Sequence, residues 1–135
     1  MQVLGVHHVA MAVEDLDEAI ETWERLYGAR VELRGRMEEQ GVDAAYLRLG
    51  SGRVELVSAL APETPVGRFI ASRGPAMHHV ALEVADLDAA IGELAGEGAN
   101  VLDPAPRRGL GGHSVSFVHP ETQHGVLTEV VEHDG

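Results

Sequence analysis

An internal repeat constrains the fold of this 135-residue chain more than any other feature of its sequence. HHVAMAVEDLDEAI, residues 7–20, matches HHVALEVADLDAAI, residues 78–91, at ten of fourteen positions and at an offset of 71. Such self-similarity is the signature of an architecture built from copies of one supersecondary unit. We therefore expect a single domain over 1–135, made of repeat one (about 3–60), a linker with a short helix (61–75) and repeat two (about 76–132).

Each copy of the repeat predicts a strand followed by an amphipathic helix. Apolar residues alternate with small or polar ones after each histidine pair, which is typical of a strand. Asp15 and Asp86 then stand where helix N-caps are expected, and apolar residues recur at helical spacing after them. Gly28 and Gly98 follow the two helices, where left-handed C-caps are expected.

Segments of alternating polarity follow each helix and complete a βαβββ pattern in each half. The expected strands are residues 30–36, 42–49, 53–57, 99–103, 114–118 and 126–131, and a short helix is expected at 65–72. The predicted fold class is α+β, with tandem βαβββ modules related by pseudo-two-fold symmetry. In this prediction the modules form a curved mixed sheet around one shared site.

Composition limits the chemistry that is available to the chain. The absence of cysteine excludes disulfides, thiolate nucleophiles and cysteine-ligated zinc, whereas eight histidines are present. A formal net charge of −12 argues against nucleic acid and anionic membrane surfaces as partners. Because the sequence has neither a secretory signal pattern nor an apolar run long enough to cross a bilayer, we expect a cytoplasmic protein.

Strand alternation predicts which histidine of each pair faces the shared site. The large apolar residues after the first pair fall on one face, which leaves His8 on the other beside small alanines, and His79 repeats this in the second copy. In the strands that close the repeats, alternation places Glu55 away from the helix, and the similarity of VELV to LTEV aligns it with Glu129. The remaining histidines considered are expected to be structural: His7, His78, His119 and His133.

One histidine and one glutamate from each repeat thus converge on a single concave surface if a two-fold axis relates the modules. Imidazole nitrogen and carboxylate oxygen suit zinc, cobalt, nickel, manganese or iron. Taken alone, a strand histidine or glutamate is more often solvated or hydrogen-bonded than a metal ligand. The symmetric placement of four such residues favours a metal site.

The repeats and this residue set resemble the vicinal oxygen chelate superfamily, also called the glyoxalase and bleomycin-resistance fold. Segments similar to signatures of its methylmalonyl-CoA epimerase family are EEQGVDAAYLRLG, VELVSALAPETPVGRFI, HHVALEV, PRRGLGGHSVSFVHP and GVLTEV. By this resemblance the protein is a homodimer that binds an acyl-CoA thioester and a divalent ion, which is cobalt, zinc, manganese or nickel. The ligands carried over from the family are His8, Glu55, His79 and Glu129.

The activity that the resemblance implies is interconversion of (2R)- and (2S)-methylmalonyl-CoA by 1,1-proton transfer through a metal-stabilised enolate. Such a reaction needs an acid/base group on each face of the planar intermediate. Glu129 is similar to the family's metal-bound base. Some members carry a second glutamate two residues after EQGV, where this chain has Ala44, so the second group is unassigned. Glu39 and Asp43 are weak substitutes for it.

Two other functions remain open from the sequence. A glyoxalase-type lactoylglutathione lyase or isomerase would use the same ligand types, whereas a drug-binding resistance protein of this fold would be non-catalytic. The EQGV and GVLxE segments favour the epimerase. A CoA substrate would also need local arginines to hold its phosphates against the net negative charge, and the candidates are Arg107, Arg108 and Arg48.

Overall fold

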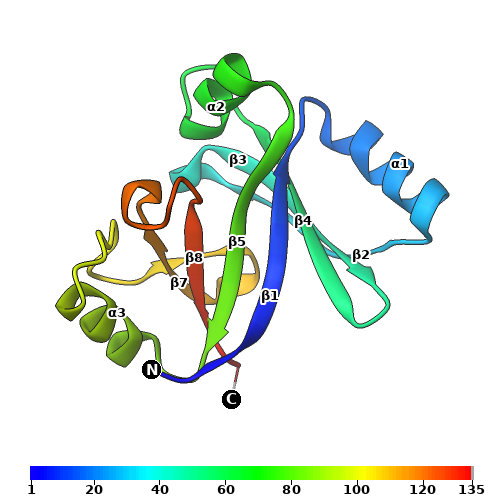
Figure 1. Cartoon of the computed structure of the whole chain (residues 1–135). Helices are drawn as coiled ribbons and strands as arrows, with labels where there is room; N and C mark the ends of the chain where they lie inside the picture. The colour runs from blue at the N-terminus through cyan, green and yellow to red at the C-terminus, as the bar shows by residue number, and fades with distance from the viewer. Residues whose placement is uncertain (135) are drawn as a thin grey trace. The chain divides into compact units, whose positions relative to one another are not determined.

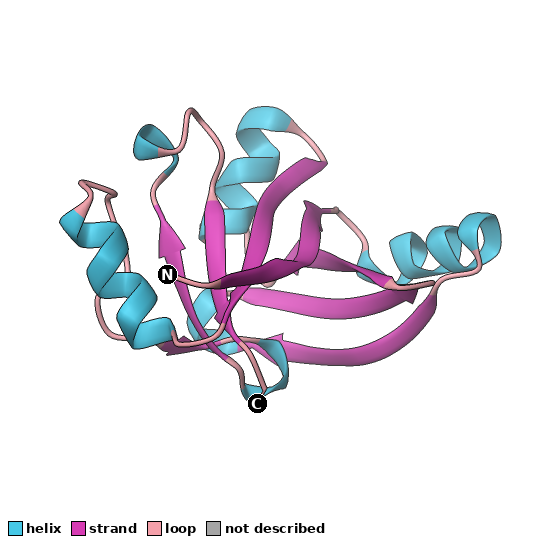
Figure 2. Ribbon diagram, turned by 60° about the horizontal axis from the view of Figure 1, so that its bottom comes forward, coloured by secondary structure: helices cyan, strands magenta, loops and turns pink. Residues whose placement is uncertain are grey.

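The computed structural model describes residues 1–134. Figure 1 and Figure 2 show its helices and strands along the chain. In order they are β1 (Val3–Ala12), α1 (Leu16–Tyr27), β2 (Arg30–Met37), η1 (Glu38–Gln40), β3 (Val42–Leu49), β4 (Gly52–Ala59), α2 (Pro65–Arg73), β5 (Ala76–Val84), α3 (Leu87–Gly96), β6 (Arg107–Arg108), η2 (Leu110–Gly112), β7 (Ser114–Val118), η3 (Pro120–Thr122) and β8 (Thr128–Glu132). In this described part of the chain, no helix combines the length and the apolarity that a membrane span requires.

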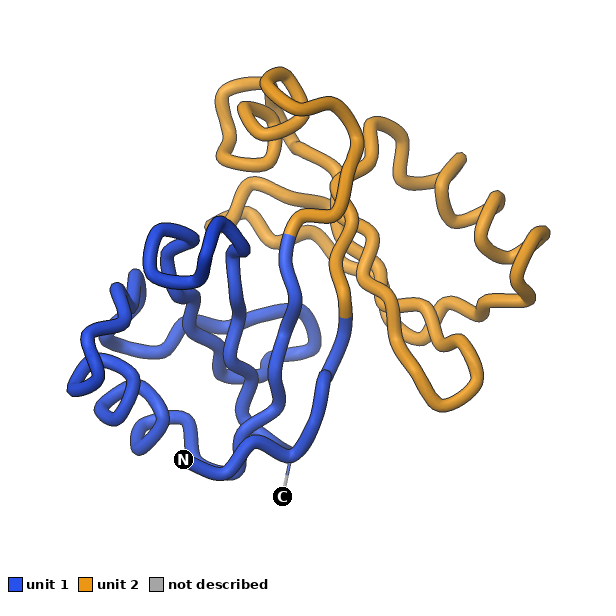
Figure 3. The backbone as a smooth tube through the Cα atoms, in the orientation of Figure 1, with its two compact units in different colours: residues 1–8, 79–135 blue, residues 9–78 orange. Residues whose placement is uncertain are grey.

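The chain forms two compact units, which Figure 3 distinguishes by colour. Unit 1 consists of residues 1–8 and 79–135, and unit 2 consists of residues 9–78. Strand β1 is therefore shared, because its first residues belong to unit 1 and its last residues to unit 2. The predicted α+β class is confirmed, and so is the linker helix, which is α2.

Residues 99–103, which were expected to form a strand, do not do so. The pairing there is limited to an isolated antiparallel bridge of Val101 with Val118, in which the Leu102 N–H donates to Phe117 O and the His119 N–H to Asn100 O, both at 2.8 Å. Two prolines follow in the sequence DPAPRR, and proline lacks the N–H that a ladder needs. The Asp103 side chain accepts a hydrogen bond from the Phe117 N–H at 3.1 Å, so a side chain takes over part of the pairing. The last strand also begins later than expected, at residue 128 instead of 126.

The helix N-caps agree with the sequence, whereas one of the two C-caps does not. The Asp15 and Asp86 side chains accept hydrogen bonds from backbone N–H groups three residues ahead, at 3.0 and 3.1 Å. Gly28 caps α1 in the left-handed conformation, with a φ of 67°. The C-cap of helix α3 is instead Glu97, whose backbone is not in the left-handed conformation. Gly98 follows it with a φ of 91°.

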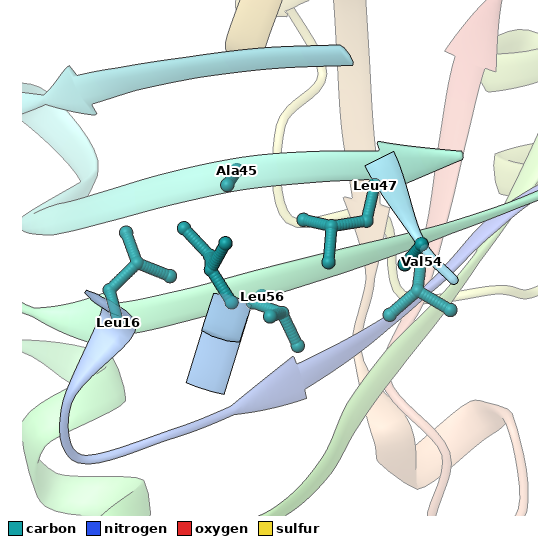
Figure 4. Packing of buried hydrophobic residues seen from close by; sticks show 7 residues of the cluster. Leu16, Ala45, Leu47, Val54 and Leu56 are labelled. Atoms are coloured by element: carbon teal, nitrogen blue, oxygen red, sulfur yellow. The ribbon is translucent and has the colours of Figure 1, made fainter. Parts of the chain in front are cut away.

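Unit 2 contains a sheet of order β2-β3-β4-β1, in which β1 is parallel to β4 and the other neighbours are antiparallel. Helix α1 packs its buried residues against one face of these strands, as the predicted apolar stripe requires. The core there includes Leu16, Ala45, Leu47, Val54 and Leu56 (Figure 4). This packing leaves the alternate residues of the strands on the opposite face of the sheet.

Unit 1 repeats the arrangement with β5, β8, β7 and β6 in that order. Strand β5 is parallel to β8, and β8 and β7 are antiparallel, as in the first repeat. The first residues of β1 lie at the end of β5, where the Ala85 N–H donates to the carbonyl of Gln2 at 3.2 Å. The core of this unit joins α3 to the sheet through Val84, Leu87 and Val130.

A β-bulge in β2 directs Glu32 toward two arginines of the β3–β4 hairpin. Val31 pairs with Leu47 and Leu33 with Tyr46, so β2 has one extra residue at this point. The Glu32 carboxylate accepts hydrogen bonds from Arg53 at 2.8 Å and from Arg48 at 2.8 and 3.1 Å. The hydrogen bond from Arg53, helped by the one from Arg48, holds the pKa of Glu32 below its ordinary value of 4.5, although partial burial opposes the shift.

We expect Glu32→Gln to destabilise the protein at pH 7 by at most about 1 kcal/mol, because the pair is partly solvated. A carboxyl whose pKa is depressed by folding stabilises the folded state above its unfolded pKa, and this contribution is lost as the pH falls through the lower folded pKa. The difference from wild type should therefore shrink below about pH 4.5. Urea unfolding at pH 7 and pH 4 measures it.

Glu38→Gln is the matched control for this prediction, because Glu38 has one arginine partner, Arg36, and both side chains are well exposed. This substitution removes the same charge from a carboxylate that is not bound by two arginines. A pH-independent loss of stability in the Glu32 variant would contradict the proposed electrostatic origin.

Candidate metal centre

Three buried polar side chains of unit 1 lie together, and each comes from a different strand. They are His8 on β1, His79 on β5 and Glu129 on β8, with 1%, 6% and 6% of their surface exposed. One donor atom of each lies within 4.8 Å of the donor atoms of the other two. The structure thus brings together three of the four residues that the sequence selected.

The distances within this cluster fit a shared divalent ion. The Nε2 atoms of His8 and His79 are 3.2 Å apart, and Oε1 of Glu129 lies 3.4 Å from the first and 4.0 Å from the second. Two donors that each lie about 2.0–2.1 Å from one ion are separated by about 2.8–3.4 Å for octahedral to tetrahedral angles. The two histidine nitrogens already have this separation, and the carboxylate oxygen is slightly farther out.

The chemistry of the cluster also suits a cation. An ionised carboxylate taken out of water is costly unless it is paired, hydrogen-bonded or bound to a metal. Imidazole nitrogens and a carboxylate oxygen together form a donor set typical of zinc, cobalt, nickel and manganese. The residues present therefore fit a divalent ion in both geometry and donor type.

Strand register explains why Glu129 meets His79. Ala81 of β5 pairs with Glu129 of β8, and paired residues share one face of the sheet. His79 lies two residues before Ala81 and hence on that same face. Its ring packs edge-on against Phe117, with ring centroids 5.3 Å apart and an interplanar angle of 90°. The small alanine leaves space beside the glutamate.

Glu55, the fourth expected ligand, belongs to unit 2 and is 7% exposed. It pairs with Ala10 of β1, just as Glu129 pairs with Ala81. Ala10 and Ala81 are equivalent in the repeat, so Glu55 occupies in unit 2 the place that Glu129 occupies in unit 1. Its role as a ligand stays a prediction.

A contact that the sequence analysis missed lies on the outer side of His8. The Nδ1 atoms of His7 and His8 are 2.7 Å apart, within hydrogen-bond distance. The ring of His7 in turn meets the ring of His113, with centroids 5.7 Å apart. Alternation assigned His7 to the opposite face and hence to a structural role. The signal that could have found it is the adjacency of two histidines, since the rings of neighbouring strand residues can meet at their edges.

The weak substitutes for the second acid/base group lie elsewhere. Asp43 accepts a hydrogen bond from Arg34 at 3.2 Å, and the same arginine holds Asp17 of helix α1. Asp43 thus points to the helix side of the sheet. Glu39 is exposed in the short helix η1. Ala44, two residues after EQGV, is buried at 1% exposure and supplies no acid/base group.

The three arginines considered for CoA phosphates all have partners within the chain. Arg48 holds Glu32, as described above, and Arg107 lies 3.3 Å from a carboxylate oxygen of Asp103. Arg108 donates to the carbonyl of Gly112 at 2.9 Å. Phosphate binding by any of them stays a prediction.

The other histidines that were expected to be structural make local contacts. His78 packs edge-on against Phe69, with ring centroids 4.9 Å apart. The Nδ1 atom of His119 accepts a hydrogen bond from the Glu121 N–H at 3.0 Å. His133 Nδ1 lies 2.6 Å from a carboxylate oxygen of Glu83.

Comparison with known proteins gives one family for most of the chain. Residues 7–117 match the model of the Glyoxalase/Bleomycin resistance protein/Dioxygenase superfamily. The mitochondrial methylmalonyl-CoA epimerase of Dictyostelium discoideum is 32% identical over 129 residues, which cover 94% of this chain and 77% of that protein. The ethylmalonyl-CoA/methylmalonyl-CoA epimerase of Cereibacter sphaeroides is 34% identical over 128 residues, covering 93% and 95%.

A solved structure agrees with these sequence relatives. A methylmalonyl-CoA epimerase in complex with methylmalonyl-CoA and NH4+ matches with a TM-score of 0.95 and 34% sequence identity. The match covers 99% of this chain and 97% of that one. The likeness therefore extends over nearly the full length of both chains.

We expect the purified, metal-free protein to bind one Co²⁺ per chain, measured by isothermal titration calorimetry. His79→Ala and Glu129→Ala should each weaken this binding by at least about 100-fold, because even partners outside the ligand shell typically contribute 10- to 100-fold. His119→Ala is the control, since this histidine is 41% exposed at its side chain and contacts Glu121 instead. Equal affinities in all three variants would rule out the cluster as the metal centre.

Proposed function

The chain belongs to the Glyoxalase/Bleomycin resistance protein/Dioxygenase superfamily and, within it, to the methylmalonyl-CoA epimerase family, and from this we propose that it interconverts the two epimers of methylmalonyl-CoA. The observation that carries the proposal is the buried cluster of His8, His79 and Glu129, because it supplies a metal-binding donor set and a carboxylate base in one place.

The reaction is a 1,1-proton transfer, in which the α-proton of the thioester leaves from one face and a proton is added to the other. Held by His8, His79 and Glu129, with Glu55 as a fourth ligand, a divalent ion would act as a Lewis acid on the thioester carbonyl and make the α-proton more acidic. The ion that we propose is cobalt, zinc, manganese or nickel. Both histidines must bind through Nε2, the atoms that face each other in the structure.

Glu129 is the proposed base. Its Oε1 atom faces the two histidines, so Oε2 is the oxygen that would accept the α-proton. Burial excludes most of the water that would otherwise compete with the substrate for the carboxylate. Strand β8 holds Glu129 rigidly, because the strand is paired on both sides, with β5 and with β7.

The other face of the substrate has no assigned acid/base group. Ala44 stands at the position where some family members have a glutamate, and it lies on the same face of β3 as Tyr46, which pairs with Glu55. A methyl group cannot transfer a proton. We therefore propose that proton exchange at the Glu129 face is faster than complete epimerisation in this chain.

The proposed substrate class is a 2-alkylmalonyl thioester of CoA. The Cereibacter sphaeroides relative is named for both ethylmalonyl-CoA and methylmalonyl-CoA, and the matched solved structure contains methylmalonyl-CoA. These relatives favour the epimerase over a glyoxalase-type lyase and over a non-catalytic drug-binding protein. We further propose a homodimer, as the resemblance implies, and a cytoplasmic location, as expected from the sequence.

Glu129→Gln should reduce deuterium incorporation at the α-carbon of methylmalonyl-CoA in heavy water by about 10²- to 10⁴-fold, the usual contribution of a general base. Proton NMR of the α-hydrogen and the methyl group follows the exchange. Glu121→Gln is the control, because its carboxylate is exposed on η3 and is 69% accessible. Full exchange by the Glu129 variant, with metal bound, would remove the role assigned to this residue.

Ala44→Glu should raise the rate of epimerisation relative to exchange, since it places a carboxyl on the face of β3 that Tyr46 shares. Ala44→Gln is the matched control, because glutamine has the same size and hydrogen-bonding capacity but does not accept a proton at neutral pH. Chiral analysis of the product and α-deuterium content, measured in the same sample, give the ratio. An equal change in this ratio in both variants would show that the size of the side chain, and not proton transfer by it, causes the effect.

A further inference from the structure

We propose that His7 is a positioning residue for the candidate metal centre: its Nδ1 accepts a hydrogen bond from Nδ1–H of His8 and thereby fixes the tautomer and the ring orientation of His8. The observation is the 2.7 Å distance between the two Nδ1 atoms. This inference rests on the metal centre proposed above, and it is independent of the substrate.

The direction of this hydrogen bond follows from the ring chemistry of His8. Its Nε2 atom faces Nε2 of His79 and Oε1 of Glu129. A neutral imidazole that uses the Nε2 lone pair for a ligand bond carries its proton on Nδ1. Nδ1 of His8 is therefore the donor, and Nδ1 of His7 must be the acceptor, with the His7 proton on its own Nε2.

Such an outer partner has two effects on a ligating histidine. It stabilises the tautomer that leaves the ligating nitrogen without a proton, and it restricts rotation of the ring. His8 is 1% exposed, so its Nδ1–H needs an acceptor within the protein. The rings of His7 and His8 are inclined at 75°, with centroids 5.0 Å apart, and a twist between the ring planes still lets the in-plane N–H of one ring meet the in-plane lone pair of the other.

The acceptor itself is held in place from its other side. The ring of His7 lies edge-on to the ring of His113, at an interplanar angle of 67°. His113 in turn lies 3.0 Å from a carboxylate oxygen of Asp134 through its Nδ1. A connected series of side chains in unit 1 therefore leads from the buried cluster to the exposed Asp134, and His7 is its inner member.

The two histidines of the cluster are thus supported by different contacts. His79 packs against the ring of Phe117 at 90° and against the ring of His8 at 74°. His8 has the additional nitrogen contact with His7. We infer that His7 tunes the affinity of the centre through His8, a role that simple packing of the His7 ring would not provide.

The test uses two variants and one control in the full-length protein. His7→Leu keeps an apolar side chain of moderate size but removes the acceptor, whereas His7→Asn keeps an acceptor oxygen close to the place of Nδ1. His119→Leu is the control, because it removes a histidine whose Nδ1 also accepts a hydrogen bond, from Glu121 N–H, without contact to the cluster. Each metal-free protein is titrated with Co²⁺ by calorimetry, and thermal unfolding is measured in parallel.

We expect His7→Leu to weaken Co²⁺ binding by about 10- to 100-fold, the range for outer partners of metal-bound histidines. His7→Asn should recover most of this loss, and His119→Leu should bind as wild type. Equal affinities of wild type and His7→Leu would overturn the proposal, as would a loss in His7→Asn as large as in His7→Leu.

A second measurement needs no variant. In the Zn²⁺-loaded, ¹⁵N-labelled wild-type protein, NMR should show a proton on Nδ1 of His8 and a coupling between the Nδ1 nitrogens of His7 and His8 across the hydrogen bond. A proton on Nε2 of His8 would overturn the proposal. If the wild type binds neither Co²⁺ nor Zn²⁺, the metal centre and this inference both fail, whereas loss of epimerase activity alone leaves the inference intact.

Discussion

The parallel pairing of the first and last strands in each repeat is the constraint on which the rest of the structure depends. In the first repeat it sets Ala10 beside Glu55, and in the second it sets Ala81 beside Glu129. Parallel strands cannot be joined by a tight turn, so a long connection must separate them. In each repeat that connection contains the helix, which covers one face of the strands and leaves the other for the glutamate.

Small residues beside the glutamates make this arrangement possible. Ala10 and Ala81 are both fully buried, so a larger side chain at either position would occupy the space beside the carboxylate. The strands consequently carry apolar side chains on the face that the helices cover, and polar side chains among alanines on the other. Close packing on the helix side fixes the strand register, because a shift by one residue would turn every side chain to the opposite face.

Most of this fold could be predicted from the sequence, because the repeat encodes the same strand and helix pattern in both halves. The caps at Asp15 and Asp86, the linker helix and the correspondence of Glu55 with Glu129 all follow from local patterns. Local patterns failed where a distant contact decides the structure. The expected strand around Val101 was lost because a side chain, that of Asp103, satisfies the backbone of the neighbouring strand.

The candidate site shows the same division between local and distant information. Alternation selected His8 and His79, because the face of a strand residue depends only on its immediate neighbours. The same rule assigned His7 to the opposite face and excluded it from the site. Alternation describes where the Cβ atom points, whereas a ring reaches several ångströms farther and its edge can return to the ring beside it. The 2.7 Å nitrogen contact is of this kind.

Because the protein carries a net negative charge, the candidate metal centre matters for binding an anionic substrate as well as for its chemistry. The net charge of −12 repels an anionic thioester, and the arginines that the sequence offered for its phosphates are engaged with groups of the chain itself. Arg48, for example, shares the carboxylate of Glu32 with Arg53, so a phosphate would have to compete with an internal anion. A divalent ion brings two positive charges to a site from which water is excluded, where electrostatic attraction is strongest. In such a protein a bound divalent ion would both activate the substrate and supply the local positive charge that holds it.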